Sequence, residues 1–292
     1  MTALLQQART FGRMIKFSHT IFALPFALAA AAIAGQGHNV GIDRWLAIVI
    51  AMASARTAAM GWNRVVDRHF DAENPRTAQR EIPSGKIPVT TAVALVVASS
   101  ALFIATSAYL GKLCLLLSPL ALALVLGYSY TKRFTWLCHL FLGFAIAAGP
   151  AGAWIAVTGA MAAPAWWLVL AVTTWIGGFD ILYALSDREF DRQAKLRSIP
   201  ARFGVLKSLW ISGILHLLTA VALVMAGHSA HLGAPYFLGV AAIAGILVWE
   251  HSIVKPTDLS RLDMAFFSLN GYVSMAFLVA TLADVLRTLY FG

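Results

Sequence analysis

Hydrophobic residues in this chain come in nine long blocks separated by short polar segments. The blocks lie near residues 18–36, 43–63, 89–109, 113–130, 134–157, 163–186, 207–227, 233–254 and 262–290. Each is about 20 residues long or longer, the length that an α-helix needs to cross the hydrocarbon core of a membrane. The apolar residues do not alternate with polar ones, so the pattern favours helices over the strands of a membrane barrel. The sequence therefore predicts an all-α, multi-pass membrane bundle of about nine transmembrane helices.

The composition agrees with a membrane protein. Of the 292 residues, 60% are apolar and 12% are charged, whereas a typical soluble domain has about 25% charged residues. A soluble protein of this size would need more polar surface to shield its core from water. The basic start and apolar first block resemble a secretory signal peptide, but eight further blocks favour an uncleaved first helix. We expect residues 1–292 to form a single transmembrane domain.

Positive charges fall almost entirely on one side of the predicted bundle. When the blocks are threaded back and forth, 18 of the 22 Lys and Arg residues lie on the side of the N-terminus, three lie on the other side, and Arg56 lies within a block. Cytoplasmic connections of membrane proteins are enriched in Lys and Arg. The N-terminus and the long connections at 64–88 and 187–207 are therefore predicted to be cytoplasmic, in a bacterial inner (plasma) membrane. This topology accounts for the net charge of +9, so we expect no nucleic acid partner.

Two acidic motifs end the second and sixth blocks, both on the predicted cytoplasmic side. Their members are spaced four residues apart: Asn63, Asp67 and Asp71 in the first motif, and Tyr183, Asp187 and Asp191 in the second. Residues four apart share one face of an α-helix, where like charges repel unless a cation lies between them. Mg²⁺ binds one or two carboxylates together with water and phosphate oxygens. The two motifs together predict a site for Mg²⁺ and a diphosphate, although either alone could be a solvated helix end neutralised by arginines.

Basic and intramembrane ionisable residues extend this predicted site. Basic side chains follow both motifs: Arg76, Arg80 and Lys86 after the first, and Lys195, Arg197 and Arg202 after the second. Arginine matches phosphate oxygens with a two-pronged fork, and lysine supplies a mobile charge. Within the blocks, Arg56 and Asp180 are candidates because ionisable groups at membrane depth are usually functional. Asp180 lies two turns before Asp187, so it either assists substrate binding and proton removal or forms a structural ion pair.

These residues resemble the UbiA superfamily of intramembrane prenyltransferases, and within it the 4-hydroxybenzoate polyprenyltransferases. The similarity covers nearly the whole chain, including segments 16–20 and 74–85 beside the acidic motifs. One departure is Arg64, which stands where many of those enzymes have an acidic residue. The resemblance implies a helical bundle around a central cavity that opens sideways to lipid and is capped by the two cytoplasmic connections.

The resemblance also implies an activity and roles for individual residues. It implies transfer, dependent on the cofactor Mg²⁺, of a polyprenyl group from an allylic diphosphate to a ring carbon of an aromatic acid, 4-hydroxybenzoate, in quinone biosynthesis. The implied metal ligands are Asn63, Asp67, Asp71, Asp187 and Asp191. The implied catalytic residues are Asp67, Asp71, Asp187, Asp191 and Asp180. Substrate binding is assigned to Arg56, Asn63, Arg76, Arg80, Tyr183, Lys195 and Lys16.

Several alternatives stay open from the sequence, including haem-farnesylating or chlorophyll-forming members of the same superfamily and a CDP-alcohol phosphatidyltransferase, although the first half of that family's motif is missing here. The same chemistry on a dihydroxynaphthoate, for menaquinone, fits the same motifs. A secondary transporter is an alternative from a different class, although transporters place their sites near the membrane midplane on broken helices, whereas these carboxylates gather at one interface. The expected partners are a polyprenyl diphosphate, the aromatic acid and membrane lipid. The length of the prenyl chain and the oligomeric state do not follow from the sequence.

Overall fold

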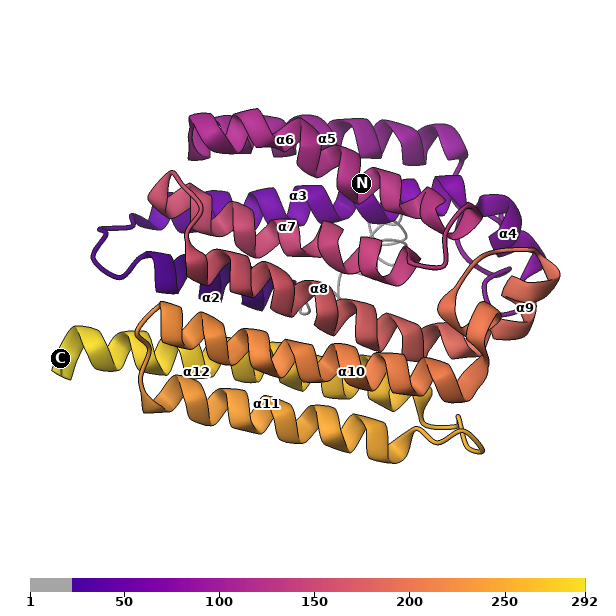
Figure 1. Cartoon of the computed structure of the whole chain (residues 1–292). Helices are drawn as coiled ribbons and strands as arrows, with labels where there is room; N and C mark the ends of the chain where they lie inside the picture. Colours follow the sequence, from indigo (N-terminus) through magenta and orange to yellow (C-terminus); the bar gives the residue numbers. More distant parts are fainter. Residues whose placement is uncertain (1–22, 292) are drawn as a thin grey trace.

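Long helices that run nearly parallel or antiparallel to one another make up the molecule (Figure 1). The computed structural model describes residues 23–291. In chain order the α-helices are α2 Leu24–Ala34, α3 Ile42–Val66, α4 Arg68–Glu73, α5 Val89–Leu110, α6 Lys112–Gly127, α7 Cys138–Thr158, α8 Ala163–Ala184, α9 Arg188–Gln193, α10 Ile199–Ser229, α11 Ala234–Ile253 and α12 Asn270–Phe291. Short helical turns of other types connect them: η2 Tyr128–Arg133, η3 Leu185–Asp187 and η4 Met264–Leu269.

Eight of the helical stretches in the described part of the chain are long and apolar enough to cross a membrane. The first predicted block corresponds to α2, an apolar helix of 11 residues. Lys16 and segment 16–20, by contrast, lie outside the described residues. The all-α, multi-pass membrane bundle predicted from the hydrophobic blocks is confirmed, with the count of nine holding approximately.

The second predicted connection, 187–207, is shorter and more ordered than the sequence indicated. The sixth span continues beyond α8 through η3 and α9, and α10 begins at Ile199. Two local signals start α10 there: the Ser198 hydroxyl accepts a hydrogen bond from the Ala201 amide at 3.3 Å, and Pro200 lies in the first turn. Such an N-cap and an early proline both favour a helix start. Gly204, with φ +77°, then kinks the helix before its apolar part, which is why the hydrophobic pattern alone placed the start later.

Helix α8 is the most buried of the spans and packs between α7 and α10. Its Trp175 is fully buried, with ring centroids 4.8 Å from Phe26 and 5.3 Å from Phe179. A Cβ atom at Gly143 of α7 would collide with the backbone of Thr173 in α8, so a glycine there permits the close approach of two membrane helices. On the outer surface Leu116, Leu238 and Val248 are each 71% exposed, as expected for side chains that face lipid.

An inner polar cluster joins α8, α10, α11 and α12 within this core. It consists of Trp175, His216, Glu250, His251 and Asn270. The Trp175 indole donates to Asn270 Oδ1 at 2.7 Å, and Asn270 Nδ2 donates to Glu250 Oε1 at 2.9 Å. The two histidine rings meet with 3.0 Å between His251 Nε2 and His216 Nδ1. Glu250 and Asn270 are fully buried and His251 is partly buried, so most of this cluster lies inside the bundle.

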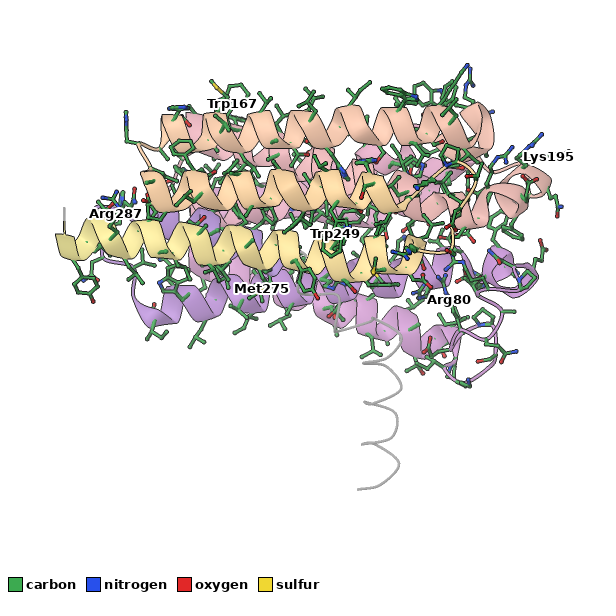
Figure 2. The ribbon with its side chains drawn as sticks, turned by 90° about the horizontal axis from the view of Figure 1, so that it is seen from below. Arg80, Trp167, Lys195, Trp249, Met275 and Arg287 are labelled. Atoms are coloured by element: carbon green, nitrogen blue, oxygen red, sulfur yellow. The ribbon has the colours of Figure 1, made fainter. Side chains whose placement is uncertain are left out.

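The charged connections gather at one end of the bundle. Figure 1 shows α4 and α9 together at that end. In the perpendicular view, Arg80 and Lys195 lie at the same end, whereas Trp167 and Arg287 lie at the opposite end (Figure 2). The fold therefore brings the two acidic motifs, separated by more than a hundred residues, to one edge of the predicted membrane region.

Candidate active site

Each acidic motif sits where a spanning helix breaks and restarts. Helix α3 ends at Asp67, which has φ −90° and ψ 6°, and α4 follows with Asp71. In the second motif Asp187 has nearly the same angles, φ −101° and ψ 3°, and α9 follows with Asp191. The motifs are thus not single straight helical faces, as the spacing of four indicated. The matching breaks turn the last carboxylate of each motif back toward the bundle, where Asp71 and Asp191 are buried.

A polar cavity of about 220 Å³ lies between the two motifs. It is enclosed by the ends of α3, α4, η2, α8 and α9 together with the segment after α4. Among the residues predicted from the sequence, its lining includes Asn63, Asp67, Asp71, Arg76, Arg80, Asp180, Tyr183, Asp187 and Asp191. The fold thus brings both predicted motifs and two of the predicted basic residues to a single cavity.

Two arginines after the first motif pair with carboxylates of both motifs. Arg80 Nη1 lies 2.6 Å from Asp71 Oδ1, within its own motif. Arg76 crosses the cavity to Asp187, donating from Nε to Oδ1 at 2.9 Å and also from Nη2 to Oδ2. Arg76 Nη1 also donates to the Tyr183 hydroxyl at 2.8 Å. Although burial alone would lower the pKa of Arg76, its hydrogen bonds to Asp187 outweigh burial and raise that pKa, so the guanidinium stays charged.

Two further cations come from the η2 turn between α6 and α7. Lys132 Nζ lies 3.4 Å from Asp191 Oδ2, and Arg133 Nη2 lies 3.2 Å from Asp67 Oδ1. Sequence reasoning assigned these two residues only to the charge asymmetry of the membrane topology. The sequence did contain a signal for them: they are two adjacent basic residues in a very short connection that lies on the same side of the membrane as both motifs.

The first motif has the electrostatic character of a cation site. Burial raises the pKa of the Asp67 carboxyl above its ordinary value, and the neighbouring Asp71 carboxylate adds to that effect, while Arg133 opposes it. Asn63 Nδ2 donates to Asp67 Oδ2 at 2.8 Å, which leaves its amide oxygen as a further oxygen ligand. Asp71 Oδ2 is buried without a hydrogen-bond partner among the described residues. A buried carboxylate oxygen of this kind is costly unless it is paired, so it suits a cation.

The type of ligand fits Mg²⁺. The candidate ligands are carboxylate and amide oxygens, which hard divalent cations prefer. Within residues 23–291 no group of three or more His, Cys, Asp or Glu side chains is gathered closely enough to hold a metal ion by itself. The carboxylates instead line opposite walls of the cavity. That distribution fits a metal ion that shares its coordination between one or two carboxylates and phosphate oxygens.

A second, apolar cavity of about 370 Å³ adjoins the first. It runs between α3, α5, α6 and α7, and Tyr128 and Leu142 line both cavities. Arg56 lies in the wall of this apolar cavity rather than in the polar one, and its Nε is buried without a hydrogen-bond partner among the described residues. A charged cavity thus adjoins an apolar one, and the partly buried Arg56 lies in the wall of the apolar cavity.

The remaining predicted residues lie elsewhere or deeper. Lys195 is exposed at the end of the bundle and does not line the polar cavity (Figure 2), and Lys16 lies outside the described residues. Asp180 lines the cavity and pairs with His139, with 2.6 Å between His139 Nδ1 and Asp180 Oδ2. Sequence reasoning missed His139, although an ionisable residue inside a predicted span was a signal that could have found it.

The chain is similar in sequence to proteins of a known family. Residues 23–275 match the model of the UbiA prenyltransferase family. The 4-hydroxybenzoate octaprenyltransferase of Vibrio parahaemolyticus is 30% identical over 285 residues, which cover 96% of this chain and 95% of the relative. The enzyme of the same name from Pseudomonas aeruginosa is 34% identical over 243 residues, covering 82% of this chain and 80% of the relative.

Solved structures give the same answer for the fold. A UbiA homologue from Aeropyrum pernix K1 superposes with a TM-score of 0.84 at 32% identity, covering 91% of this chain and 98% of that one. A UbiA homologue from Archaeoglobus fulgidus bound to GPP and Mg²⁺ superposes with a TM-score of 0.70 at 19% identity, covering 94% and 99%. The matches agree with the resemblance found in the sequence and favour a prenyltransferase over a secondary transporter. The chain belongs to the UbiA prenyltransferase family.

Proposed function

We propose that this protein transfers a polyprenyl group from an allylic diphosphate to a ring carbon of 4-hydroxybenzoate, with Mg²⁺ as cofactor. One observation carries the proposal: a polar cavity lined by carboxylates and their paired cations adjoins an apolar cavity, and Tyr128 and Leu142 line both. A prenyl diphosphate has the same two parts, a head with several negative charges and a hydrocarbon tail. The names of the bacterial relatives support the acceptor, and the archaeal homologue bound to GPP and Mg²⁺ supports the donor and the metal.

The diphosphate belongs in the polar cavity. Metal binding is assigned to oxygen atoms of the two motifs: Asn63, Asp67, Asp71, Asp187 and Asp191. When bound, Mg²⁺ would neutralise the diphosphate and stabilise it as a leaving group. Arg76 and Arg80 hold carboxylates of opposite motifs, and a guanidinium has five donors, so each can also bind phosphate oxygens. Lys132 and Arg133 add two further positive charges on the η2 side.

Transfer requires a leaving group, a nucleophilic ring and a proton acceptor. The allylic C–O bond breaks as its electron pair passes to the diphosphate, where the cationic side chains stabilise the developing charge. The ring carbon next to the acceptor's hydroxyl forms the new C–C bond and then loses its hydrogen as a proton. Asp180, which lines the cavity, is the proposed proton acceptor. The apolar walls keep water from capturing the allylic cation.

Arg56 is the proposed partner of the acceptor's carboxylate. Arg56 is partly buried in the wall of the apolar cavity, and its buried Nε has no hydrogen-bond partner among the residues described. A guanidinium binds a planar, two-oxygen anion with two parallel hydrogen bonds. Binding there would hold the aromatic ring between Arg56 and the cation formed at the polar cavity.

The membrane orientation and the extent of the domain belong to the same proposal. The end of the bundle that carries both motifs is assigned to the cytoplasmic side of the bacterial inner membrane, as the distribution of Lys and Arg predicts. The whole chain, residues 1–292, is assigned to one transmembrane domain. A diphosphate donor made in the cytoplasm could then enter the polar cavity while its tail remains among apolar helices.

A transfer assay on the purified protein in detergent tests the proposal. The mixture contains Mg²⁺, geranyl diphosphate and either 4-hydroxybenzoate or a dihydroxynaphthoate, and mass spectrometry detects the product. We expect a prenylated 4-hydroxybenzoate whose formation stops with EDTA. A prenylated dihydroxynaphthoate instead would keep the chemistry and change the acceptor. Folded protein that yields no product with any aromatic acid, including with longer donors, would overturn the proposal.

A further inference from the structure

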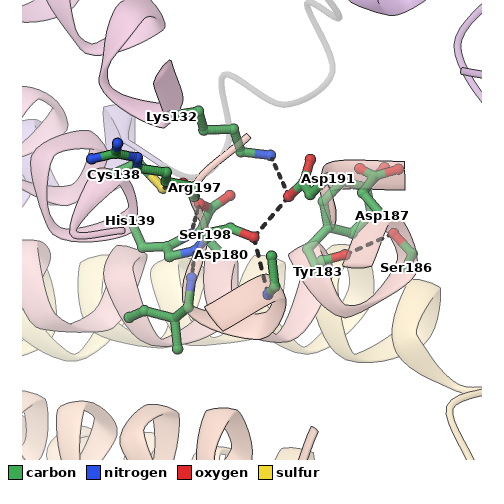
Figure 3. A network of polar contacts seen from close by, with 12 residues as sticks. Lys132, Cys138, His139, Asp180, Tyr183, Ser186, Asp187, Asp191, Arg197 and Ser198 are labelled. Atoms are coloured by element: carbon green, nitrogen blue, oxygen red, sulfur yellow. Dashed lines mark hydrogen bonds and ion pairs between the residues drawn. The ribbon is translucent and has the colours of Figure 1, made fainter. Parts of the chain in front are cut away.

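A fully buried histidine stands behind the proposed proton acceptor. His139 lies in the first turn of α7, and its side chain has no exposed surface. Figure 3 shows its ring directed at Asp180 of α8, with 2.6 Å between Nδ1 and the carboxylate oxygen Oδ2. Gly143, one turn further along α7, permits the close contact with α8 that brings these side chains together.

The other ring nitrogen determines where the proton of His139 lies. His139 Nε2 is 3.3 Å from the backbone amide of Ile199, the first residue of α10. A backbone N–H can only donate, so Nε2 must be the acceptor and cannot carry a hydrogen itself. The proton of a neutral imidazole must then be on Nδ1. His139 Nδ1 therefore donates its hydrogen bond to Asp180 Oδ2.

The same turn of α10 also holds a carboxylate of the second motif. The Ser198 hydroxyl donates to Asp191 Oδ2 at 2.8 Å and caps α10 by accepting from the Ala201 amide (Figure 3). Ser198 and Ile199 are adjacent, so one helical terminus contacts Asp191 on one side and His139 on the other. The N-terminus of α10 thereby helps to set the distance between Asp191, which is assigned to the metal, and Asp180, which is assigned to the ring proton.

We infer that His139 is a positioning residue that fixes the orientation of the Asp180 carboxyl group for removal of the ring proton, and that α10 sets the tautomer of His139. This inference rests on the proposed function. In the step concerned, the electron pair of the ring C–H bond returns to the ring and restores aromaticity. The proton passes to the Asp180 carboxylate. His139 touches neither substrate and acts through Asp180 alone.

Substitutions that keep one hydrogen bond at a time separate this role from simple packing. His139→Asn places an amide donor near the position of Nδ1 and can still reach Asp180. His139→Gln places its amide near the position of Nε2, so it can accept from Ile199 but loses the bond to Asp180. His139→Leu loses both. We expect kcat to fall about 10- to 100-fold in the Leu and Gln variants and much less in the Asn variant, with KM for the donor unchanged.

A double-mutant cycle with Asp180→Asn gives the decisive readout. A residue that acts through Asp180 has nothing left to act on once that carboxylate is removed. We expect His139→Leu to change kcat less than about twofold in the Asp180→Asn background, although it lowers kcat strongly in the wild-type background. Acceptor deuterated at the ring carbons next to the hydroxyl should also show a larger kinetic isotope effect in His139→Leu. A loss of equal size in both backgrounds would mean a structural role and overturn the inference.

Nitrogen NMR of the histidine-labelled protein tests the geometry without turnover. The signal that disappears in His139→Asn identifies the residue, and we expect a protonated Nδ1 and an unprotonated Nε2. A protonated Nε2 would overturn the inference whatever the activity. If His139→Leu fails to fold, the Asn and Gln pair decides: an active Gln variant beside an inactive Asn variant contradicts the role. If the wild-type protein forms no product, the proposed function is contradicted. The NMR measurement then still tests the tautomer of His139 by itself.

Discussion

The polar cavity and the inner polar cluster are two collections of polar residues in one bundle, and of the helices that form them they share α8. In the polar cavity each of four motif carboxylates has a long cationic partner, and the cavity is open enough to admit a ligand. In the inner polar cluster the carboxyl of Glu250 is fully buried and is bonded to Asn270, beside two histidines. Open, cation-paired carboxylates can exchange partners with a diphosphate. The hydrogen bonds of the inner polar cluster join side chains of four helices to one another, so we expect them to stabilise the packing of those helices.

This difference separates function from stability within one membrane bundle. Arginine and lysine side chains are long, so their charged ends can move from a carboxylate to a phosphate while the backbone stays in place. Asn270, in contrast, is held by Trp175 and also donates to the carbonyl of Ala265 in the π-helical turn η4, so it has no alternative arrangement. We expect substitutions in the polar cavity to lower the rate and those in the inner polar cluster to lower stability.

The largest effect should come from removing a motif carboxylate or the metal. Asp67→Asn and Asp191→Asn should each lower kcat about 10³-fold, because the leaving group loses its charge stabilisation, and EDTA should remove activity until Mg²⁺ is restored. The melting temperature should stay near that of the wild-type protein. Product formation followed by mass spectrometry and thermal unfolding in detergent measure the two quantities. Full activity of either variant would contradict the assignment.

Removal of the Glu250 carboxyl group should lower stability and leave the reaction rate unchanged, the opposite of the effect of removing a motif carboxylate. Glu250→Ala removes one of the two acceptors of the Asn270 amide, the Glu250 carboxyl oxygen at 2.9 Å, and leaves the carbonyl of Ala265. The loss of a buried hydrogen-bond partner should lower the free energy of unfolding by about 2 kcal/mol, roughly thirtyfold in the unfolding equilibrium. We expect the activity of the folded fraction to remain close to wild type. Ser252→Ala, on the exposed face of the next turn, is the matched control and should change neither quantity.

A pair of basic residues tests which cations face the diphosphate. Arg80 lines the polar cavity and pairs with Asp71, whereas Lys195 is exposed outside it. Arg80→Ala should raise KM for the donor about tenfold, as expected for a lost charge-assisted phosphate contact. Lys195→Ala should change KM little. An equal effect of the two substitutions would mean that the general positive field, and not the cavity, attracts the donor.

The smallest effect should appear at the passage between the two cavities. Leu142 lines both cavities, whereas the neighbouring Phe141 faces outward and is 44% exposed. Leu142→Trp should narrow the passage and lower kcat/KM for long-chain donors about fivefold relative to geranyl diphosphate, because overpacking costs on the order of 1 kcal/mol or more. Phe141→Trp is the control of equal size. A uniform loss with all donors would place the prenyl chain elsewhere.

The sequence by itself determined the class of the protein. Continuous apolar blocks and the bias of Lys and Arg are local features, and a membrane forces such blocks into helices. The same features placed both acidic motifs on one side, since each follows an even-numbered span. The family followed from the motifs, and the relatives confirmed it. The approximate count of spans and the gathering of Asp67, Asp71, Asp187 and Asp191 around one cavity agree with what the sequence predicted.

Only the tertiary structure decided which side chains meet. The contacts of Arg76 with Asp187 and of His139 with Asp180 join residues that are 111 and 41 positions apart, and they depend on how helices pack rather than on spacing. The breaks at Asp67 and Asp187, the early start of α10 and the place of Lys132 beside Asp191 were hidden for the same reason. Hydrophobic periodicity reports which segments leave water, but the partners of a polar side chain are set by packing across the bundle.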